Sequence, residues 1–254
     1  FELARQTDYM ALDLYEIGRW MRLFEFLDLG RSAGSAYGKP FLLMEYHAGP
    51  NDWAPVVRGR DLAIEANAAL ARESRALMWY MWRPAPASTE QGIHGMLDME
   101  GKPTERYTVA AEVSALTARL APLLLKSRTP ADIAIATSED SDYLSFAQGK
   151  PPQQRKLPWS NLGHLLDAAR IQWDFVDGPL LLNSDLSRYR AVILGHIPVL
   201  GDEVLQRLDD YVRAGGTLIT HPDVAVLDGY GHARKDVEFE EGGKSNGLWT
   251  VRVR

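Results

Sequence analysis

The sequence predicts an α/β protein in which strands and helices alternate over two successive segments. Short apolar runs that end in polar residues, typical of buried strands, alternate with longer amphipathic stretches typical of helices. The alternation begins anew after a break at Ser127–Pro130. The chain has 254 residues, 46% of them hydrophobic and 24% charged, which suits one large or two ordinary domains of a soluble globular protein.

The first segment reads strand, helix, strand, helix, strand, loop, helix, an order that predicts a parallel sheet. A strand is expected at Asp8–Tyr15 and a helix at Gly18–Leu29. The continuous apolar run Phe41–Met44 follows a turn and predicts a second buried strand. The remaining elements are a helix rich in alanine, leucine and glutamate, a third strand and a long helix, at Arg60–Ser74, Ala76–Trp82 and Tyr107–Lys126.

The second segment predicts an open α/β sheet. Its strands are expected at Asp132–Thr137, Ile171–Val176, Ala191–Leu194 and Thr217–Thr220. Helices are expected at Asn161–Arg170 and Glu203–Ala214, the latter closed by two glycines, and the proline-containing stretch Leu144–Trp159 predicts a loop. The expected domains are therefore 1–127 and 128–236, with 237–254 as the start of a further, truncated segment.

Composition excludes several classes of protein. A net charge of −6 argues against a sequence-independent nucleic-acid binder, and the sequence has neither a basic run for a membrane surface nor an apolar stretch long enough to span a bilayer. The absence of cysteine excludes disulfides, cysteine-ligated zinc and a cysteine nucleophile. It fits a reducing compartment, so we expect a cytoplasmic protein. The chain begins with Phe1 and reads from the middle of a domain, so we also expect it to be a fragment.

The segment Lys39–Pro55 carries the clearest chemical signal, with the sequence KPFLLMEYHAGPNDWAP. Glu45 lies where the buried strand ends, and catalytic groups of (β/α)₈ barrels project from the carboxyl ends of strands. A carboxylate there can attack an anomeric carbon as a nucleophile. A helix-capping or ion-paired glutamate is the alternative.

Aromatic and polar residues surround this segment in the sequence. Trp53 follows in the next loop, and flat indole faces suit the C–H faces of sugars, whereas we expect Trp79 and Tyr80 to pack in the core. Glu90 and His94 can bind sugar hydroxyls as acceptor and donor. They could also be a metal pair, but no third ligand is evident, and a solvated loop is the simpler interpretation.

Together these motifs resemble glycoside hydrolase family 42, the β-galactosidases. The resemblance covers about the first half of the chain, as strands six to eight of a (β/α)₈ TIM barrel. It rests on Lys39 to Glu45, Asn51 with Trp53, Trp82-Arg83, and Glu90-Gln91 with His94. His94 lies four residues after Glu90, a longer step than is usual in the family.

The resemblance implies a retaining exo-glycosidase that releases terminal β-D-galactose, with no cofactor and no metal. Glu45 would be the nucleophile, Tyr15 would orient it, and Trp53, Glu90 and His94 would line the galactose subsite. The acid/base carboxylate would follow an asparagine upstream of Asp8, outside this chain. Alternatives are related sugars such as β-D-fucosides or α-L-arabinopyranosides, or a catalytically silent carbohydrate-binding or assembly subunit.

The second segment resembles the trimerisation domain of the same family, which has an amidotransferase-like, flavodoxin-like fold. The resemblance is carried by Asp132–Tyr143, Leu186–Leu200 and Leu208–Thr220. It implies a homotrimer and an assembly role for this domain, because amidotransferases need a nucleophilic cysteine and the sequence has none. His164, His196 and His221 are expected to be structural or surface residues.

Overall fold

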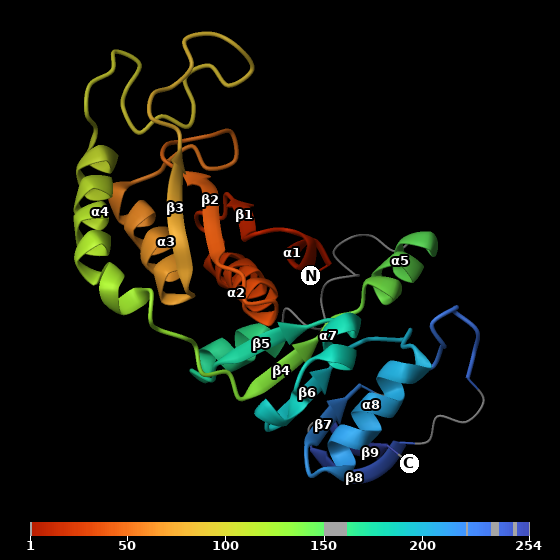
Figure 1. Ribbon diagram of the computed structural model, residues 1–254. Helices are drawn as coiled ribbons and strands as arrows, with labels where there is room; N and C mark the ends of the chain where they lie inside the picture. Colours follow the sequence, from red (N-terminus) through yellow and green to blue (C-terminus); the bar gives the residue numbers. More distant parts are fainter. Residues whose placement is uncertain (1, 150–161, 222, 235–238, 246–247, 254) are drawn as a thin grey trace. The chain divides into compact units, whose positions relative to one another are not determined.

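The computed structural model describes residues 2–149, 162–221, 223–234, 239–245 and 248–253. The chain folds into two compact units, Phe1–Thr129 and Pro130–Arg254, and each contains a sheet of mainly parallel strands with helices (Figure 1). The predicted α/β class is confirmed.

The first unit contains a three-stranded parallel sheet in the order β1-β2-β3. Helix α3 packs against both β3 and α4, while α2 packs against β1 and β2 (Figure 1). The elements are α1 (Glu2–Gln6), β1 (Met10–Leu14), α2 (Trp20–Ala36), β2 (Phe41–His47), α3 (Gly59–Ala71), β3 (Ser74–Tyr80) and α4 (Glu105–Leu124). All six elements predicted for this segment are present, and α1 is an addition.

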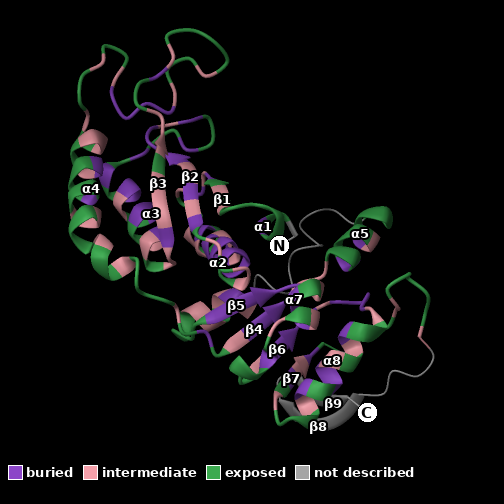
Figure 2. Ribbon diagram, in the orientation of Figure 1, coloured by how far each residue is buried: buried purple, intermediate pink, exposed green. Residues whose placement is uncertain are grey.

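The core of the first unit lies between the sheet and its helices. Phe41, Leu43 and Tyr46 of β2 are buried, and they meet Leu23 and Leu27 of α2. Figure 2 shows the buried stretches of β2 and α2 in purple. Because β2 is the central strand, its carboxyl end is flanked by the ends of β1 and β3, and the residues that follow the three strands meet at one edge.

The second unit is an open sheet in the order β5-β4-β6-β7-β9-β8. The first four of these strands are parallel, β9 pairs antiparallel with β7, and β8 pairs antiparallel with β9. Its elements are β4 (Ile133–Ala136), α5 (Glu139–Ala147), a helix at 162–168, β5 (Trp173–Val176), α7 (Gly178–Asn183), a 3₁₀ turn (Leu186–Arg188), β6 (Ala191–Leu194), α8 (Asp202–Arg213), β7 (Thr217–Thr220), β8 (Phe239–Ser245) and β9 (Leu248–Val253).

The second unit differs from the prediction in three places. Helix α5 extends to Ala147, into the stretch predicted as a loop, and at its start the Ser138 side chain accepts a hydrogen bond from the Ser141 backbone N–H. The rest of that predicted loop, from 150 on, lies outside the described residues. Helix α7 was not predicted; it begins where the Asp177 side chain accepts from the Leu180 N–H. Strands β8 and β9 extend the sheet of this unit, where the sequence predicted the start of a further segment.

Among the described residues, no helix combines the length and the apolar character needed to cross a lipid bilayer.

Candidate active site

Glu45 lies near the carboxyl end of β2 and is half-buried. Its carboxylate Oε1 accepts a hydrogen bond of 2.7 Å from the hydroxyl of Tyr15, the residue that follows β1. Within the part of the chain that the structure describes, Glu45 forms no ion pair. The arrangement differs from both alternatives for this glutamate, since the side chain neither caps a helix nor neutralises a cation.

Tyr15 remains a hydrogen-bond donor over the physiological range. Burial raises the pKa of the Tyr15 hydroxyl far above its ordinary value, and the hydrogen bond to the Glu45 carboxylate raises it further. Both effects disfavour the phenolate. The hydroxyl therefore keeps its proton and can hold the Glu45 carboxylate in one orientation.

His94 lies at the centre of a group of rings next to Glu45. Its imidazole contacts Tyr15, Tyr80 and Trp53 edge to face, with centroid separations of 5.4, 5.2 and 6.4 Å. Tyr15 and Trp53 are themselves 6.2 Å apart. The indole of Trp53 is 56% exposed, so an apolar face remains free at the edge of this group. Tyr15, Trp53 and His94, which were predicted as site residues from three separate parts of the sequence, thus lie together.

The His94 imidazole is neutral at neutral pH. Burial is the main cause that lowers its pKa, and His47 also lowers it, against the nearby carboxylate of Glu90. Its Nδ1 is buried without a hydrogen-bond partner among the described residues. A neutral imidazole offers one donor and one acceptor, which matches the dual character of a sugar hydroxyl.

The backbone at His94 ties two loops together. Its N–H donates to the carbonyl of Pro50 (2.6 Å), in the loop that carries Trp53, and its carbonyl accepts from Met81 (2.8 Å). Met96 in turn donates to the carbonyl of Met81 (2.8 Å). His94 has a positive φ of 64°, a conformation uncommon for a residue with a side chain. The imidazole is therefore placed by the backbone of both loops.

Tyr80 differs from its predicted role as a core residue. It is half-buried, and its hydroxyl donates to Glu90 Oε2 over 2.6 Å while its ring contacts His94. The four-residue step from Glu90 to His94 does not separate the two side chains, because both meet Tyr80. Trp79, by contrast, packs against the core from β3.

Sequence reasoning missed a buried network behind Tyr15. The rings of His47 and Tyr15 lie 4.9 Å apart, and His47 Nδ1 lies 3.3 Å from Glu65 Oε1 of α3. Asn51 Oδ1 accepts from the Ala54 N–H, so its Nδ2 faces His47 Nε2 at 3.4 Å. That orientation makes Nε2 the acceptor, and Nδ1–H therefore donates to Glu65.

Burial keeps this network uncharged. It raises the pKa of Glu65 to about 9, with Asp61 and Glu16 adding to the shift, and it lowers the pKa of His47 to about 4. Both side chains are fully buried. At neutral pH a protonated carboxyl and a neutral imidazole therefore support the Tyr15 ring.

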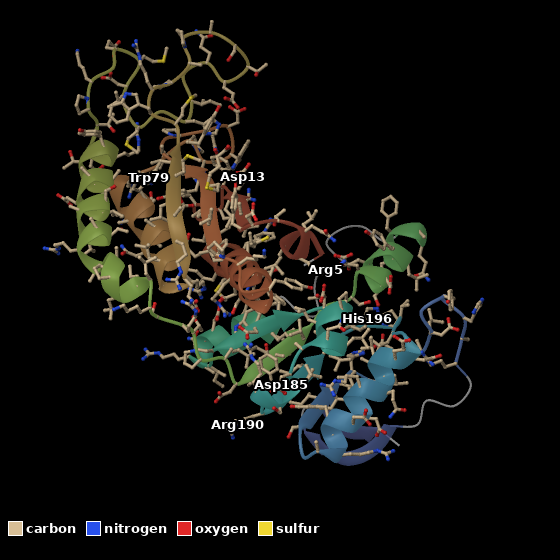
Figure 3. All side chains as sticks on the ribbon, viewed as in Figure 1. Arg5, Asp13, Trp79, Asp185, Arg190 and His196 are labelled. Carbon is tan, nitrogen blue, oxygen red and sulfur yellow. The ribbon has the colours of Figure 1, made fainter. Side chains whose placement is uncertain are left out.

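Asp13 is a second carboxylate beside Glu45 that sequence reasoning did not single out. It pairs with Glu45 across the β1–β2 register, and Figure 3 labels it on β1. Burial raises the pKa of Asp13, and the Glu45 carboxylate raises it further. The signal was available, because Asp13 and Tyr15 are two residues apart and side chains alternate along a strand.

Arg106, near the start of α4, forms hydrogen bonds with both the loop after β2 and the loop that carries His94. Its Nε donates to the carbonyl of Ala48 (3.1 Å) and its Nη2 to that of Gly95 (3.0 Å). The loops approach so closely that a Cβ on Gly49 would lie 2.2 Å from the Gly95 carbonyl oxygen. Only glycine fits there, and the guanidinium fixes the separation of the two loops.

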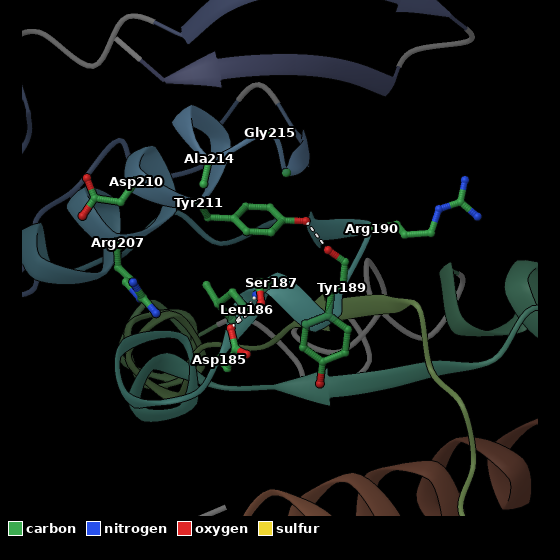
Figure 4. Close-up of a pocket in the computed structure, with 11 residues that line it drawn as sticks. Asp185, Leu186, Ser187, Tyr189, Arg190, Arg207, Asp210, Tyr211, Ala214 and Gly215 are labelled. Carbon is green, nitrogen blue, oxygen red and sulfur yellow. Dashed lines mark hydrogen bonds between the residues drawn. The ribbon is translucent and has the colours of Figure 1, made fainter.

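A separate cavity of about 360 Å³ lies in the second unit, at the amino ends of β6 and β7 (Figure 4). Tyr211 lines it and donates its hydroxyl to the Tyr189 carbonyl over 3.0 Å, and Arg207 and Asp185 contribute charges. None of the predicted site residues lines this cavity.

Comparison with known proteins places these observations in a family. Residues 1–121 match the family model described as β-galactosidase of glycoside hydrolase family 42, and residues 164–237 match the model of the β-galactosidase trimerisation domain. The β-galactosidase BgaH of Haloferax lucentense is 28% identical over 91% of this chain, and Pbg of Clostridium perfringens is 25% identical over 75%. The chain spans 33% and 28% of the lengths of these two relatives.

Solved structures agree with the fold. The β-galactosidase of Halorubrum lacusprofundi superposes with a TM-score of 0.74 at 25% identity, over 91% of this chain and 36% of its own. A catalytic mutant of the family 42 β-galactosidase Gan42B from G. stearothermophilus gives 0.78 at 22% identity, over 93% and 36%. The first unit thus has the fold of part of a (β/α)₈ barrel, and both matched stretches of the chain are similar to glycoside hydrolase family 42, the β-galactosidases.

Proposed function

We propose that the complete enzyme releases terminal β-D-galactose from β-galactosides with retention of configuration, and that Glu45 is its nucleophile. One observation carries the proposal. The Glu45 carboxylate is free of cations among the described residues, is oriented by Tyr15 and stands beside the rings of His94 and Trp53. The names of the curated relatives support galactose as the sugar.

The mechanism is a double displacement. Glu45 attacks the anomeric carbon, the bond to the leaving oxygen breaks, and a carboxylic acid gives that oxygen its proton. Water, deprotonated by the resulting carboxylate, then cleaves the glycosyl ester and frees Glu45. The second carboxyl group must lie roughly 5–5.5 Å from the nucleophile. We propose, from the family resemblance, that it follows an asparagine in the barrel sequence upstream of Asp8.

The surrounding side chains suit the recognition of a single terminal sugar. The exposed indole of Trp53 offers an apolar face to the sugar ring. Glu90 accepts a hydrogen bond from Tyr80 through one carboxylate oxygen, which leaves the other for a sugar hydroxyl. His94 adds a neutral donor or acceptor from the same side.

Replacement of the nucleophile tests the proposal in the complete enzyme. Glu45→Gln and Glu45→Ala should each lower kcat for an aryl β-D-galactoside by several orders of magnitude, because the glycosyl ester cannot form. Glu112→Gln, an exposed carboxylate on α4, is the matched control and should keep wild-type activity. Near wild-type turnover in Glu45→Gln would exclude Glu45 as the nucleophile.

Covalent trapping gives an independent test. A 2-deoxy-2-fluoro galactoside with an activated leaving group should inactivate the enzyme with a burst of one leaving group per active site. Mass spectrometry of the digest should place the fluorosugar on the peptide that contains Glu45. A label on another carboxylate would show that this other residue is the nucleophile. Galactose binding without any turnover would favour the alternative of a catalytically silent carbohydrate-binding subunit.

We propose further that the enzyme is a homotrimer assembled through the second unit, which the trimerisation-domain match supports. Analytical ultracentrifugation of the complete enzyme should give a single species of three times the chain mass. A monomer at micromolar concentration would contradict this proposal and leave that for Glu45 intact.

A further inference from the structure

Two histidines and an aspartate meet at the carboxyl edge of the second sheet. His196 lies two residues after β6, and His221 directly follows β7, the neighbouring parallel strand. Figure 3 labels His196 next to the sheet of this unit. In open α/β sheets, ligands bind outside the carboxyl ends of the strands. Asp223 comes from the same loop as His221.

The aspartate stands between the two imidazoles. Its Oδ2 contacts Nδ1 of His196 and its Oδ1 contacts Nδ1 of His221. The two rings are 6.0 Å apart and nearly perpendicular, at 87°. One nitrogen from each histidine and one carboxylate oxygen all lie within 4.8 Å of one another. Three potential metal-ligand atoms, one from each side chain, thus lie close together.

The backbone holds both loops in place. His221 donates its N–H to the carbonyl of Leu194, the last residue of β6, over 3.1 Å. Ala225 donates to the carbonyl of Ile197 over 2.9 Å, and both of these residues are buried. The ligand side chains therefore project from anchored loops, which reduces the ordering needed to bind an ion.

The site is also accessible. The side chains of His196, His221 and Asp223 are 33%, 52% and 35% exposed, so an ion can enter and water can complete its coordination. Two imidazole nitrogens and one carboxylate oxygen are a ligand set typical of zinc and related divalent transition metals, with open positions for water. Hard cations such as Mg²⁺ and Ca²⁺ prefer oxygen ligands throughout.

We propose that His196, His221 and Asp223 form a site for one divalent transition-metal ion of the zinc class. The ion links the loop after β6 to the loop after β7. The site lies in the second unit and does not depend on the galactosidase reaction proposed for the first.

Titration with zinc tests the site in the complete enzyme after treatment with EDTA. Isothermal titration calorimetry with ZnCl₂ should show a binding event in the wild type that weakens at least tenfold in His196→Ala and in His221→Ala. His232→Ala is the matched control, because His232 is an exposed histidine that contacts one aspartate, Asp228, without a second imidazole. It should bind zinc as the wild type does. Equal zinc affinity in all four proteins, or no binding in the wild type, would overturn the proposal.

Further measurements distinguish a loss of zinc binding from a loss of folding. Thermal denaturation should show that zinc raises the Tm of the wild type and of His232→Ala, and raises it less in the two site variants. The far-ultraviolet circular dichroism of each variant checks that it is folded. If His221→Ala does not fold, His196→Ala and His196→Gln, on the other loop, carry the comparison. Co²⁺ should give visible ligand-field bands in the wild type that His196→Gln abolishes, and their persistence would contradict the assignment.

Discussion

At the scale of single residues, the candidate site depends on the hydrogen bond between Tyr15 and Glu45. The hydroxyl meets the carboxylate at 2.7 Å, and the buried ring of His47 contacts Tyr15 from behind. The proposed nucleophile must be held along the line of attack, since small misplacements of reacting groups reduce the rate strongly. In the proposed mechanism, Tyr15 is thus a positioning residue for Glu45.

Removal of the Tyr15 hydroxyl should weaken catalysis without unfolding the protein. A hydrogen bond to a charged group is worth about 1.5–3 kcal/mol, so Tyr15→Phe should lower kcat/KM for an aryl galactoside by about 10- to 100-fold. The ring contacts with His47 and His94 persist in the variant, and its Tm should stay within a few degrees of the wild type. Tyr143→Phe, an exposed tyrosine on α5, is the control. Unchanged kcat/KM in Tyr15→Phe would show that the Tyr15 hydroxyl does not contribute to catalysis.

The sequence predicted Glu45, Tyr15, Trp53, Glu90 and His94 as site residues, and the structure brings all five into one neighbourhood. Tyr80 was misassigned, because a strand composition of ALMWYMW does not reveal which ring turns toward the sheet edge. Partners such as Glu65 and Arg106 were missed because their contacts join residues 18 and 58 positions apart. Composition and spacing carry no information on such pairings.

At the scale of elements, the site is formed by two loops held at a fixed separation. Gly95 packs so tightly that an added Cβ would lie 2.1 Å from Cδ of the Pro84 ring. Its carbonyl is also an acceptor for Arg106. Glycine is required here by the close approach of backbone and ring, since its φ is not in the left-handed region.

Gly95→Ala should therefore displace the loop that carries His94. We expect a loss of roughly 1–3 kcal/mol in stability from overpacking, together with a rise in KM as His94 and Glu90 move from the proposed galactose subsite. Gly178→Ala, where an added Cβ meets nothing within 4 Å, is the control. Measurement of Tm and KM checks both effects, and wild-type values for both in Gly95→Ala would contradict the described packing.

Helices and strands could be predicted from the sequence where the spacing of apolar residues is regular. The run Phe41–Met44 and the amphipathic stretch Glu203–Ala214 correspond closely to β2 and α8. The start of α5 was missed because a single serine cap, not an apolar pattern, begins that helix. Strand β9 was not assigned to this sheet because its pairing with β7 is a long-range property.

At the scale of the whole molecule, the uncharged pair of His47 and Glu65 links folding to pH. The folded pKa of Glu65, about 9, is far above its ordinary value of 4.5, so the folded protein retains a proton that the unfolded chain has lost. Stability from this group is complete below about pH 4.5 and is lost as pH rises to 9. His47 acts in the opposite direction, since its folded pKa of about 4 lies below 6.5 and it reduces stability as pH falls through that interval.

Glu65→Gln should isolate the first of these effects. Between pH 7 and 9, His47 is neutral in both states, and each pH unit reduces the stability of the wild type by up to about 1.4 kcal/mol through Glu65. The variant cannot ionise at this position, so the Tm of the wild type should fall more steeply over this interval than that of Glu65→Gln. Glu112→Gln is exposed and should follow the wild type. Parallel pH profiles for wild type and Glu65→Gln would show that Glu65 ionises normally in the fold.

The two ends of the loop between β3 and α4 are hydrogen-bonded to each other, and this affects how the loop can vary. Met81 bonds to His94, and Met96 bonds back to Met81, so the intervening chain leaves and returns at one point. Lengthening a chain segment whose ends already meet costs little entropy. The residues between Pro84 and Ile93 can then be exchanged as one segment, and in the proposed enzyme this would alter sugar preference while the strand that carries Glu45 stays unchanged.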